Sequence, residues 1–457
     1  MEDILFHAAT VATSAILGYG ITKRLIPVVA NHLLTRTNLN GVDMGKKDRP
    51  RLPESLGIVV GLTYLFSFVL LFVITPLILV SFNVLNSFSL SEKLCISTQD
   101  DGTSGYNNSL SIVAAITSVT AMLLLGFFDD CYDLRWRYKL MFPFAASVPL
   151  LSVYYYNYRD RTTVLVPQFL SRYFNLETSI NLGIFYYIFM LMFVIFCTNA
   201  INIYSGINGL EVGQSIVLSI TIILYNIVEI RTRLDCDEVH VLSLQILIPF
   251  LFCSIALYQF NRYPAKVFVG DSYCYFAGMT LAVVGILGHF SEEILLFSIP
   301  QVFNFLLSVP QLFKFLPCPR HRLPNFNKET GLREPSEFKF KYSELNILGR
   351  LLLKIYSMLG FARVQPLPPS PKIDDDSIPN DTIPPQSVPE EQNSELGLLT
   401  QRIDEQEYSS NNLTLINLWL CWFGPKSERD LCHQLLRLQS SLSFIALAFL
   451  TVKMHNE

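Results

Sequence analysis

Residues 183–214 read GIFYYIFMLMFVIFCTNAINIYSGINGLEVGQ. Residues 183–199 are almost wholly apolar and approach the length of roughly 20 residues that one helical crossing of a bilayer core needs. Amides and glycines follow directly, so polar groups stand where an apolar helix would leave the hydrocarbon. This pattern predicts an all-α polytopic membrane protein with polar loops at the membrane edge.

The composition of the whole chain agrees with this fold class. Of its 457 residues 51% are hydrophobic and 16% charged, with a mean hydropathy of +0.37, whereas soluble domains carry about a quarter charged residues. The 34 Lys and Arg residues against 38 Asp and Glu give no basic field, so nucleic-acid binding is excluded. The 9 cysteines form no C-x-x-C pair and indicate neither a zinc site nor a disulfide framework.

Apolar runs along the chain predict about ten transmembrane helices. They cover approximately 4–22, 57–80, 111–128, 140–156, 183–199, 212–229, 242–258, 272–290, 294–316 and 431–450. Connections of one parity carry roughly twice as many Lys and Arg residues as those of the other, which places that set in the cytosol. Both chain ends are then expected in the opposite compartment.

The same parity divides the chain into three predicted parts. Residues 1–316 form a transmembrane catalytic bundle of nine spans, 317–430 a cytosolic substrate-recognition segment, and 431–457 the tenth transmembrane helix with a short lumenal tail. Within the cytosolic segment, residues 364–396 are rich in Pro, Asp, Glu and Ser and are predicted to be disordered. Of the sequons at Asn107, Asn380 and Asn412, only Asn107 falls on the lumenal side.

Five polar clusters fall in the cytosolic connections, as expected if they build one site. They are residues 40–55, 126–139, 197–214, 261–272 and 317–324. Each has an ordinary structural explanation, such as an interhelical Asn pair, an N-cap role for Asp271 or basic residues flanking a span. The adjacent Asp129 and Asp130 imply a compensating cation, because ionisable groups near hydrocarbon are costly. Five clusters on one face favour a functional site.

The residue types in these clusters suit phosphoryl transfer with Mg²⁺. Asn199 and Asn202 project from one helix face, and Asp and Asn oxygens are ligands that Mg²⁺ takes together with phosphates and water. Arg320 and Arg322 suit a diphosphate, because guanidinium groups pair bidentately with phosphate oxygens. Such transfer needs positioning and charge neutralisation rather than a strong nucleophile. A transporter or channel is the alternative class, but its acids are expected near mid-bilayer rather than at one edge.

Five motifs carry a resemblance to a known family. GFFDDCYDLRWRYK (126–139), FCTNAINIYSGINGLEVGQ (196–214), NRYPAKVFVGDSYCYFAGMT (261–280), VFNFLLSVPQLFKFLPCPRHRLP (302–324) and NLTLINLWLCWFGPKSERDL (412–431) resemble the eukaryotic UDP-N-acetylglucosamine–dolichyl-phosphate N-acetylglucosamine-1-phosphotransferases. The resemblance implies transfer of GlcNAc-1-phosphate from UDP-GlcNAc to dolichyl phosphate, giving GlcNAc-diphosphodolichol and UMP. This is the first step of lipid-linked oligosaccharide synthesis for protein N-glycosylation.

The resemblance also implies a setting for the reaction. It implies a multi-pass protein of the endoplasmic reticulum membrane, surrounded by lipid, with Mg²⁺ as cofactor and an active site that faces the cytosol. A homodimer is compatible with it.

The resemblance implies roles for individual residues as well. The expected Mg²⁺ ligands are Asn202 and Asp271, and the expected catalytic residues are Asp129, Asp130, Lys139 and Asn199. The expected UDP-GlcNAc contacts are Val42, Asp43, Met44, Glu54, Asn208, Arg320, His321 and Arg322. The expected dolichyl-phosphate contacts are Lys139, Ile195, Phe196, Cys197, Thr198, Asn199, Ala200, Ile201, Asn202 and Ile203. The two aspartates are expected mainly to organise Lys139 and the metal, because a phosphate monoester is largely dianionic at pH 7 and needs no strong base. Proton removal by one of them is the minor alternative. Asp133 is given no essential role.

Overall fold

The protein is described by a computed structural model that is mainly helical. It describes residues 2–37, 39–75, 108–132, 134, 136–158, 162–165, 179–232, 238–368 and 406–456. These residues fall into two compact units, Met1–Phe303 with Ser427–Glu457, and Asn304–Lys426. Asn107, Asp133 and Asn380 lie outside the described residues.

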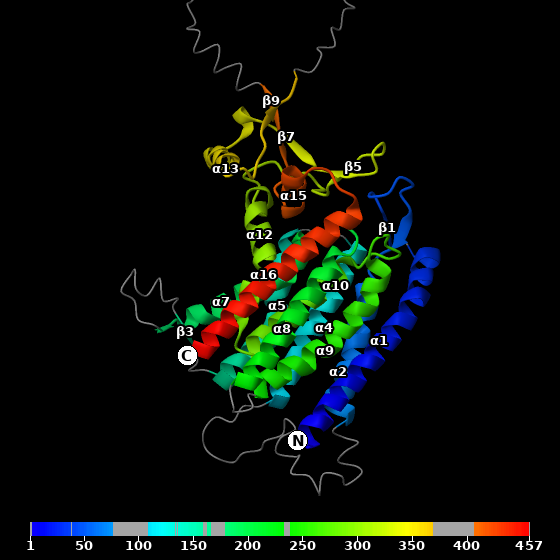
Figure 1. The fold of residues 1–457 in the computed structure, drawn as a ribbon, viewed down its shortest axis with the longest axis vertical. Helices are drawn as coiled ribbons and strands as arrows, with labels where there is room; N and C mark the ends of the chain where they lie inside the picture. Colours follow the sequence, from blue (N-terminus) through cyan, green and yellow to red (C-terminus); the bar gives the residue numbers. More distant parts are fainter. Residues whose placement is uncertain are drawn as a thin grey trace, which may run out of the picture. The chain divides into compact units, whose positions relative to one another are not determined.

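The first unit is a helical bundle (Figure 1). Its helices are α1 (Glu2–Arg36), α2 (Gly57–Val69) with the π-helical turn η1 (Leu70–Ile74), α4 (Asn108–Tyr132), α5 (Trp136–Tyr158), α7 (Ile184–Ile203), α8 (Leu210–Thr232), α9 (Glu238–Asn261), α10 (Gly270–Leu287), α11 (Ser291–Phe297) and α16 (Glu428–Asn456). Two antiparallel hairpins join them, β1 (Asn40–Val42) with β2 (Arg51–Pro53), and β3 (Thr163–Leu165) with β4 (Ser179–Asn181).

Helix α10 lies at the centre of this bundle. It packs against α2, α4 and α7, and every residue from Ser272 to Leu287 is buried. Glycines let its neighbours approach closely. A Cβ at Gly57 of α2 would lie 2.2 Å from the backbone nitrogen of Tyr273, and one at Gly126 of α4 would lie 2.5 Å from the Cα of Ser272. The first turn of α10 is therefore fixed between α2 and α4.

Long apolar helices confirm a polytopic membrane protein. Among the described residues, 7 helices are long and apolar enough to cross a membrane, and the count is 8 if α11 and α12 (Ile299–Leu312), which are bent by 77°, form one span. The predicted ninth span, 294–316, is thus a broken helix rather than a straight one. Helices α1 and α5 cover the predicted runs 4–22 and 140–156 but are not among the 7, so the total of ten remains a prediction.

Different segments of the chain lie at the two ends of the bundle. The start of α1 and the end of α16 lie at one end of the first unit, and the β1–β2 hairpin lies at the other (Figure 1). This agrees with the expectation that both chain ends share a side and that residues 40–55 face the opposite one.

The second unit combines short strands and helices. After α12 come β5 (Asn325–Phe326), β6 (Arg333–Glu334), β7 (Glu337–Lys341), the 3₁₀ turn η4 (Tyr342–Glu344), α13 (Ile347–Met358), β8 (Gln365–Pro366), β9 (Glu407–Asn411) and α15 (Leu415–Phe423). Strands β7, β9 and β8 form an antiparallel sheet in that order. The all-α prediction therefore describes the bundle apart from its two short hairpins, and it is wrong for this unit, which contains a three-stranded sheet.

The start of the predicted disordered insert is also ordered. Gln365 and Pro366 pair with Ser409 and Tyr408 of β9, so the prediction of disorder over 364–396 is wrong for its first residues. Residues 369–405 lie outside the described part of the chain. Because the two paired segments are far apart in sequence, local composition gave no sign of their pairing.

Candidate active site

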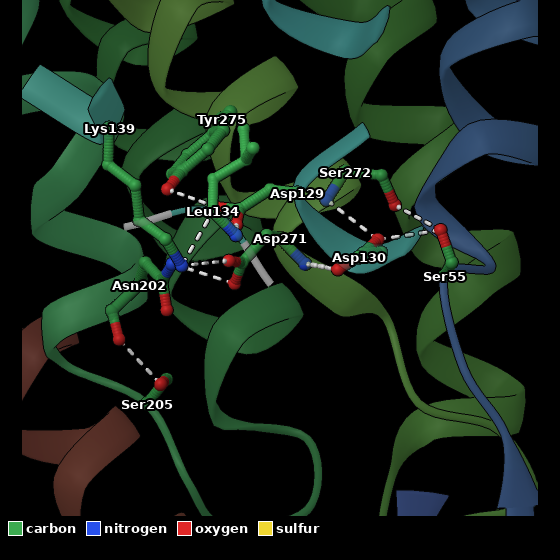
Figure 2. A network of polar contacts seen from close by, with 10 residues as sticks. All are labelled: Ser55, Asp129, Asp130, Leu134, Lys139, Asn202, Ser205, Asp271, Ser272 and Tyr275. Carbon is green, nitrogen blue, oxygen red and sulfur yellow. Dashed lines mark hydrogen bonds and ion pairs between the residues drawn. The ribbon is translucent and has the colours of Figure 1, made fainter. Parts of the chain in front are cut away.

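Four helix ends bring polar side chains together at one end of the bundle (Figure 2). Asp129 lies in the last turn of α4, Lys139 in the first turn of α5, Asn202 in the last turn of α7 and Asp271 in the first turn of α10. We call these four residues the ion-pair cluster. Their position in terminal turns matches an edge site rather than the mid-bilayer acids of a transporter.

Lys139 is shared by two carboxylates in this cluster. Its Nζ lies 2.9 Å from Oδ2 of Asp129 and 3.3 Å from Oδ2 of Asp271. The Nδ2 of Asn202 donates to Oδ1 of Asp271 at 2.8 Å. Lys139 is thus the cation that the acidic pair implied. The structure brings together both predicted metal ligands and two of the predicted catalytic residues.

The charge of Lys139 is stabilised by these contacts. Burial opposes the charged form, but the attraction of Asp271 and the ion pair with Asp129 outweigh it and raise the pKa of Lys139 above its ordinary value. Asp129, which is 3% exposed, is itself held by the hydroxyl of Tyr275 at 2.9 Å and the backbone N–H of Leu134 at 3.0 Å. Lys139 therefore stays an ammonium group at neutral pH.

Asp130 contacts a different set of groups from its neighbour Asp129. Its Oδ1 accepts the backbone N–H of Asp271 at 2.6 Å, and its Oδ2 accepts the backbone N–H of Ser272 at 3.2 Å and the hydroxyl of Ser55 at 2.6 Å (Figure 2). The first N–H groups of a helix have no partner within it, so Asp130 caps α10 from the neighbouring helix.

This cap excludes one of the two interpretations of Asp271, its role as the N-cap of α10. Helix α10 has Val269 at its N-cap position, with no side-chain capping bond, while the side chain of Asp271 contacts Lys139 and Asn202. The N-cap alternative for Asp271 is therefore wrong. Gly270 makes the arrangement possible, because its φ is +74° and a Cβ there would lie 2.3 Å from Oδ2 of Asp130.

A second group of polar residues holds two loops, and we call it the loop cluster. It consists of Asp43, Lys46, Asn208 and Glu428. Oδ2 of Asp43 lies 2.9 Å from Nζ of Lys46 and accepts Nδ2 of Asn208 at 3.2 Å, and its Oδ1 accepts the backbone N–H of Gly45 at 2.9 Å. The buried Glu428 at the start of α16 accepts the backbone N–H of Asn208 at 2.8 Å.

The pKa values of the two predicted nucleotide carboxyl groups near the β1–β2 hairpin, Asp43 in its loop and Glu54 directly after β2, shift in opposite directions. Burial opposes the charge of Asp43, but hydrogen bonds from Lys46 and Asn208 outweigh it and hold the pKa of Asp43 below its ordinary value. Burial and the nearby charge of Asp130 raise the pKa of Glu54. Of the other predicted contacts in this loop, Val42 and Met44 are exposed.

The segment between β2 and α2 is hydrogen-bonded to the segment that leads into α10. The backbone N–H of Phe268 donates to the carbonyl of Pro53 at 2.8 Å, and the N–H of Gly57 donates to the carbonyl of Val269 at 2.9 Å. The hydroxyl of Ser55 also donates to Asp130. Together these bonds link the hairpin that carries the predicted nucleotide residues Asp43 and Glu54 to the start of α10, where the predicted metal ligand Asp271 lies.

The predicted dolichyl-phosphate segment 195–203 is the C-terminal half of α7. Its side chains at Cys197, Thr198, Ala200 and Ile201 are buried, and those at Ile195, Phe196, Asn199, Asn202 and Ile203 are half-buried. Nδ2 of Asn199 donates to the carbonyl of Ile195 at 2.8 Å, within its own helix. Asn199 and Asn202 thus bind different partners, although they are close on the helix.

Arg320, His321 and Arg322 belong to the second unit. Arg320 and His321 are exposed. Arg322 is half-buried, its Nη1 has no hydrogen-bond partner, and burial lowers its pKa. A buried guanidinium nitrogen without an acceptor suits an anionic ligand. The expected contact of these three residues with UDP-GlcNAc stays a prediction.

Several site residues were not found from the sequence. Ser55, Ser272 and Tyr275 had no separate signal beyond lying within or beside the polar motifs. Glu428 lies 220 residues from Asn208, so only the tertiary structure joins them. Gly213, in the polar cluster 197–214, serves helix packing, because a Cβ there would lie 2.6 Å from Leu436 of α16.

The donor set of the ion-pair cluster fits Mg²⁺. Among the described residues no group of three or more His, Cys, Asp or Glu side chains is arranged as a metal site, but Mg²⁺ is held by one or two carboxylates with phosphates and water. Asp271 supplies a carboxylate. Asn202, already in contact with it, would supply its Oδ1 if the amide turned over, which changes its shape little.

Comparison with known proteins identifies the family. Residues 112–289 match the family described as Glycosyl transferase family 4. A Saccharomyces cerevisiae protein named UDP-N-acetylglucosamine–dolichyl-phosphate N-acetylglucosaminephosphotransferase is 39% identical over 437 residues, which cover 94% of this chain and 88% of that protein. The chain belongs to this phosphotransferase family.

Two further members of the phosphotransferase family support the assignment. The protein of the same name from Dictyostelium discoideum is 45% identical over 337 residues, covering 69% of this chain and 75% of that protein. The one from Schizosaccharomyces pombe is 39% identical over 363 residues, covering 77% and 78%. The region matched to Glycosyl transferase family 4 runs from α4 to just beyond α10 and contains the whole ion-pair cluster of this phosphotransferase.

Proposed function

We propose that the protein transfers GlcNAc-1-phosphate from UDP-GlcNAc to dolichyl phosphate. An oxygen of dolichyl phosphate attacks the phosphorus that carries GlcNAc, a new diphosphate bond forms, and the bond to the departing UMP breaks. The single observation that carries the proposal is the ion-pair cluster, in a chain whose relatives carry this enzyme's name. Phosphoryl transfer depends on positioning and on stabilising charge, which this cluster supplies.

Lys139 binds the attacking phosphate in this proposal. Its ammonium group sits between two carboxylates and is the positive charge that a phosphate dianion meets at the membrane edge. Asp129, fixed by Tyr275 and Leu134, keeps Lys139 oriented. Asp130 acts one step away, because it holds the first turn of α10 and so the position of Asp271.

The remaining predicted site residues would bind the metal and UDP-GlcNAc. Asp271 and Asn202 would hold Mg²⁺, which when bound neutralises charge on the diphosphate. Asp43, Asn208 and Glu54 would contact the uridine and GlcNAc parts, with the loops kept in place by Lys46 and Glu428. Arg320 and Arg322 would bind the diphosphate.

The proposed setting is the endoplasmic reticulum membrane, with the site facing the cytosol. The excess of Lys and Arg in the connections on the side of the polar clusters supports this orientation. The start of α1 and the end of α16 lie at the end of the bundle opposite the β1–β2 hairpin, which is consistent with this orientation (Figure 1).

Release of UMP by the purified protein in detergent tests the function. With dolichyl phosphate and Mg²⁺ we expect UMP from UDP-GlcNAc, much less from UDP-GalNAc or UDP-glucose, and none after EDTA. If EDTA acts by removing the metal, excess Mg²⁺ should restore UMP release. UMP at background level with UDP-GlcNAc would overturn the proposal.

A further inference from the structure

Helix α13 in the second unit exposes a row of large apolar side chains. The exposed fraction is 89% for Ile347, 51% for Leu351 and 78% for Met358. The complete row, which we call the apolar stripe, is Ile347, Leu348, Leu351, Ile355, Met358 and Leu359. At 3.6 residues per turn these positions cover an arc of about 120° on one side of the helix.

The other two sides of α13 are of different character. One side packs on the core of its own unit, because Leu353 is buried beside Phe338 and Phe340. The remaining side carries Arg350, Lys354 and Ser357, all exposed. An exposed apolar arc next to a basic polar arc is the pattern of helices that lie in a membrane interface.

The attachment of α13 places it beside a helix assigned to the membrane. Its Tyr356 hydroxyl donates to the carbonyl of Leu306 in α12 at 2.7 Å. At the other end of α13, a Cβ on Gly349 would lie 2.3 Å from the carbonyl oxygen of Phe315, just after α12. Helix α12 is the second half of the bent pair that passes as a membrane span. These two contacts fix α13 beside the second half of α12 and the residues that directly follow it.

Leu306 of α12 and Phe313, directly after α12, are exposed apolar residues as well. Leu306 is 55% exposed and Phe313 is 53% exposed, and Lys314 beside Phe313 is exposed as well. Apolar side chains flanked by Lys and Arg are what the boundary between acyl chains and anionic headgroups accommodates.

We propose that α13 lies in the headgroup layer of the leaflet at which the second unit emerges. The apolar stripe enters the upper acyl chains, and Arg350 and Lys354 meet the phosphates of anionic phospholipids. The helix then holds the second unit at the surface where a lipid-linked phosphate presents its head group, a consequence that rests on the proposed function.

Photo-crosslinking of the full chain tests this placement. The protein is reconstituted in nanodiscs of neutral phospholipid with a fraction of anionic phospholipid, and p-benzoylphenylalanine replaces either Ile355 in the stripe or Ser357 on the polar side. We expect phospholipid adducts at position 355, seen by mass spectrometry, in at least about fivefold excess over position 357. UMP release by both variants shows that each is folded, and it separates a failure of this proposal from a failure of the proposed function.

Three outcomes would overturn the proposal. They are equal lipid adducts at the two positions, adducts at position 355 that join a second copy of the chain, and no adduct at 355 in a protein that releases UMP. The role of the basic side chains is tested by omitting the anionic phospholipid. The lipid adduct at position 355 should then fall by about twofold or more, and an unchanged yield would remove the headgroup contact of Arg350 and Lys354 from the proposal.

Discussion

The ion-pair cluster and the loop cluster both place carboxylates beside a lysine, but they bind different kinds of group. In the ion-pair cluster, Lys139 and Asn202 each contact the side chain of Asp271 through their own side chains. In the loop cluster, Asp43 also contacts the side chains of Lys46 and Asn208. In addition, Asp43 and Glu428 accept the backbone N–H groups of Gly45 and Asn208, which belong to the loops themselves. Side-chain partners can be exchanged for a substrate without moving the backbone, whereas carboxylates on backbone N–H groups fix the shape of a loop.

This difference assigns separate kinetic roles to the two clusters. We expect the ion-pair cluster to determine the rate of phosphoryl transfer, and the loop cluster to determine how tightly UDP-GlcNAc binds. The predictions below test that separation through kcat and KM.

The largest effect is expected for Asp271→Asn. The variant loses the carboxylate that faces both Lys139 and Asn202, so kcat should fall by about 1000-fold, while the protein stays folded and inserted. The measurement is UMP release at saturating substrates and Mg²⁺. Asp48→Asn, in an exposed loop position, is the matched control. Near-normal turnover of Asp271→Asn at saturating Mg²⁺ would remove Asp271 from the proposed metal site.

The next effect concerns the shared cation. Lys139→Gln leaves Asp129 and Asp271 without a positive partner and the attacking phosphate without its anchor, so kcat should fall by about 100-fold. Lys139→Arg keeps the charge and should recover part of the loss. A titration of dolichyl phosphate separates the effect on kcat from that on KM. If Gln and Arg behaved alike, charge would not be the property that matters.

A smaller effect, on KM rather than on kcat, is expected for a substitution in the loop cluster. Glu428→Ala removes the acceptor of the Asn208 backbone N–H, and the KM for UDP-GlcNAc should rise about tenfold with kcat within about twofold. Glu428→Gln retains an acceptor oxygen and should restore most of the affinity. A fall in kcat at unchanged KM would contradict the division between the clusters.

The smallest effect is a pH dependence at Glu54, which belongs to neither cluster. Because its pKa is raised from 4.5 by burial and by Asp130, the folded state favours the protonated form, and stability is lost as pH rises from 4.5 through the raised pKa. Glu54→Gln should therefore raise the melting temperature at pH 7 by about 2 °C, with the difference vanishing below about pH 4.5. A thermal melt of the full chain at several pH values measures this, and a difference that grows as pH falls would reverse the sign.

All four residues of the ion-pair cluster were already candidates from the sequence. Asp129, Lys139, Asn202 and Asp271 stand at the ends of apolar runs, and the parity of those runs places all four ends on one side. The parity of the spans cannot predict which side chains contact each other within the cluster. Asp129 and Asp130 are neighbours, yet one binds Lys139 and the other caps α10, because successive residues on a helix point about 100° apart.

The sequence by itself indicated a polytopic membrane protein and the polar motifs 40–55, 126–139, 197–214 and 261–272, which meet at one end of the bundle. Hydropathy and charge are properties of each residue and its near neighbours, so they can be read along the chain. Only the tertiary structure decided the break between α11 and α12, the β7–β9–β8 sheet and the bond from Glu428 to Asn208. These features join segments that lie far apart in the chain or depend on how helices pack, and their free energy comes from contacts that no local pattern contains.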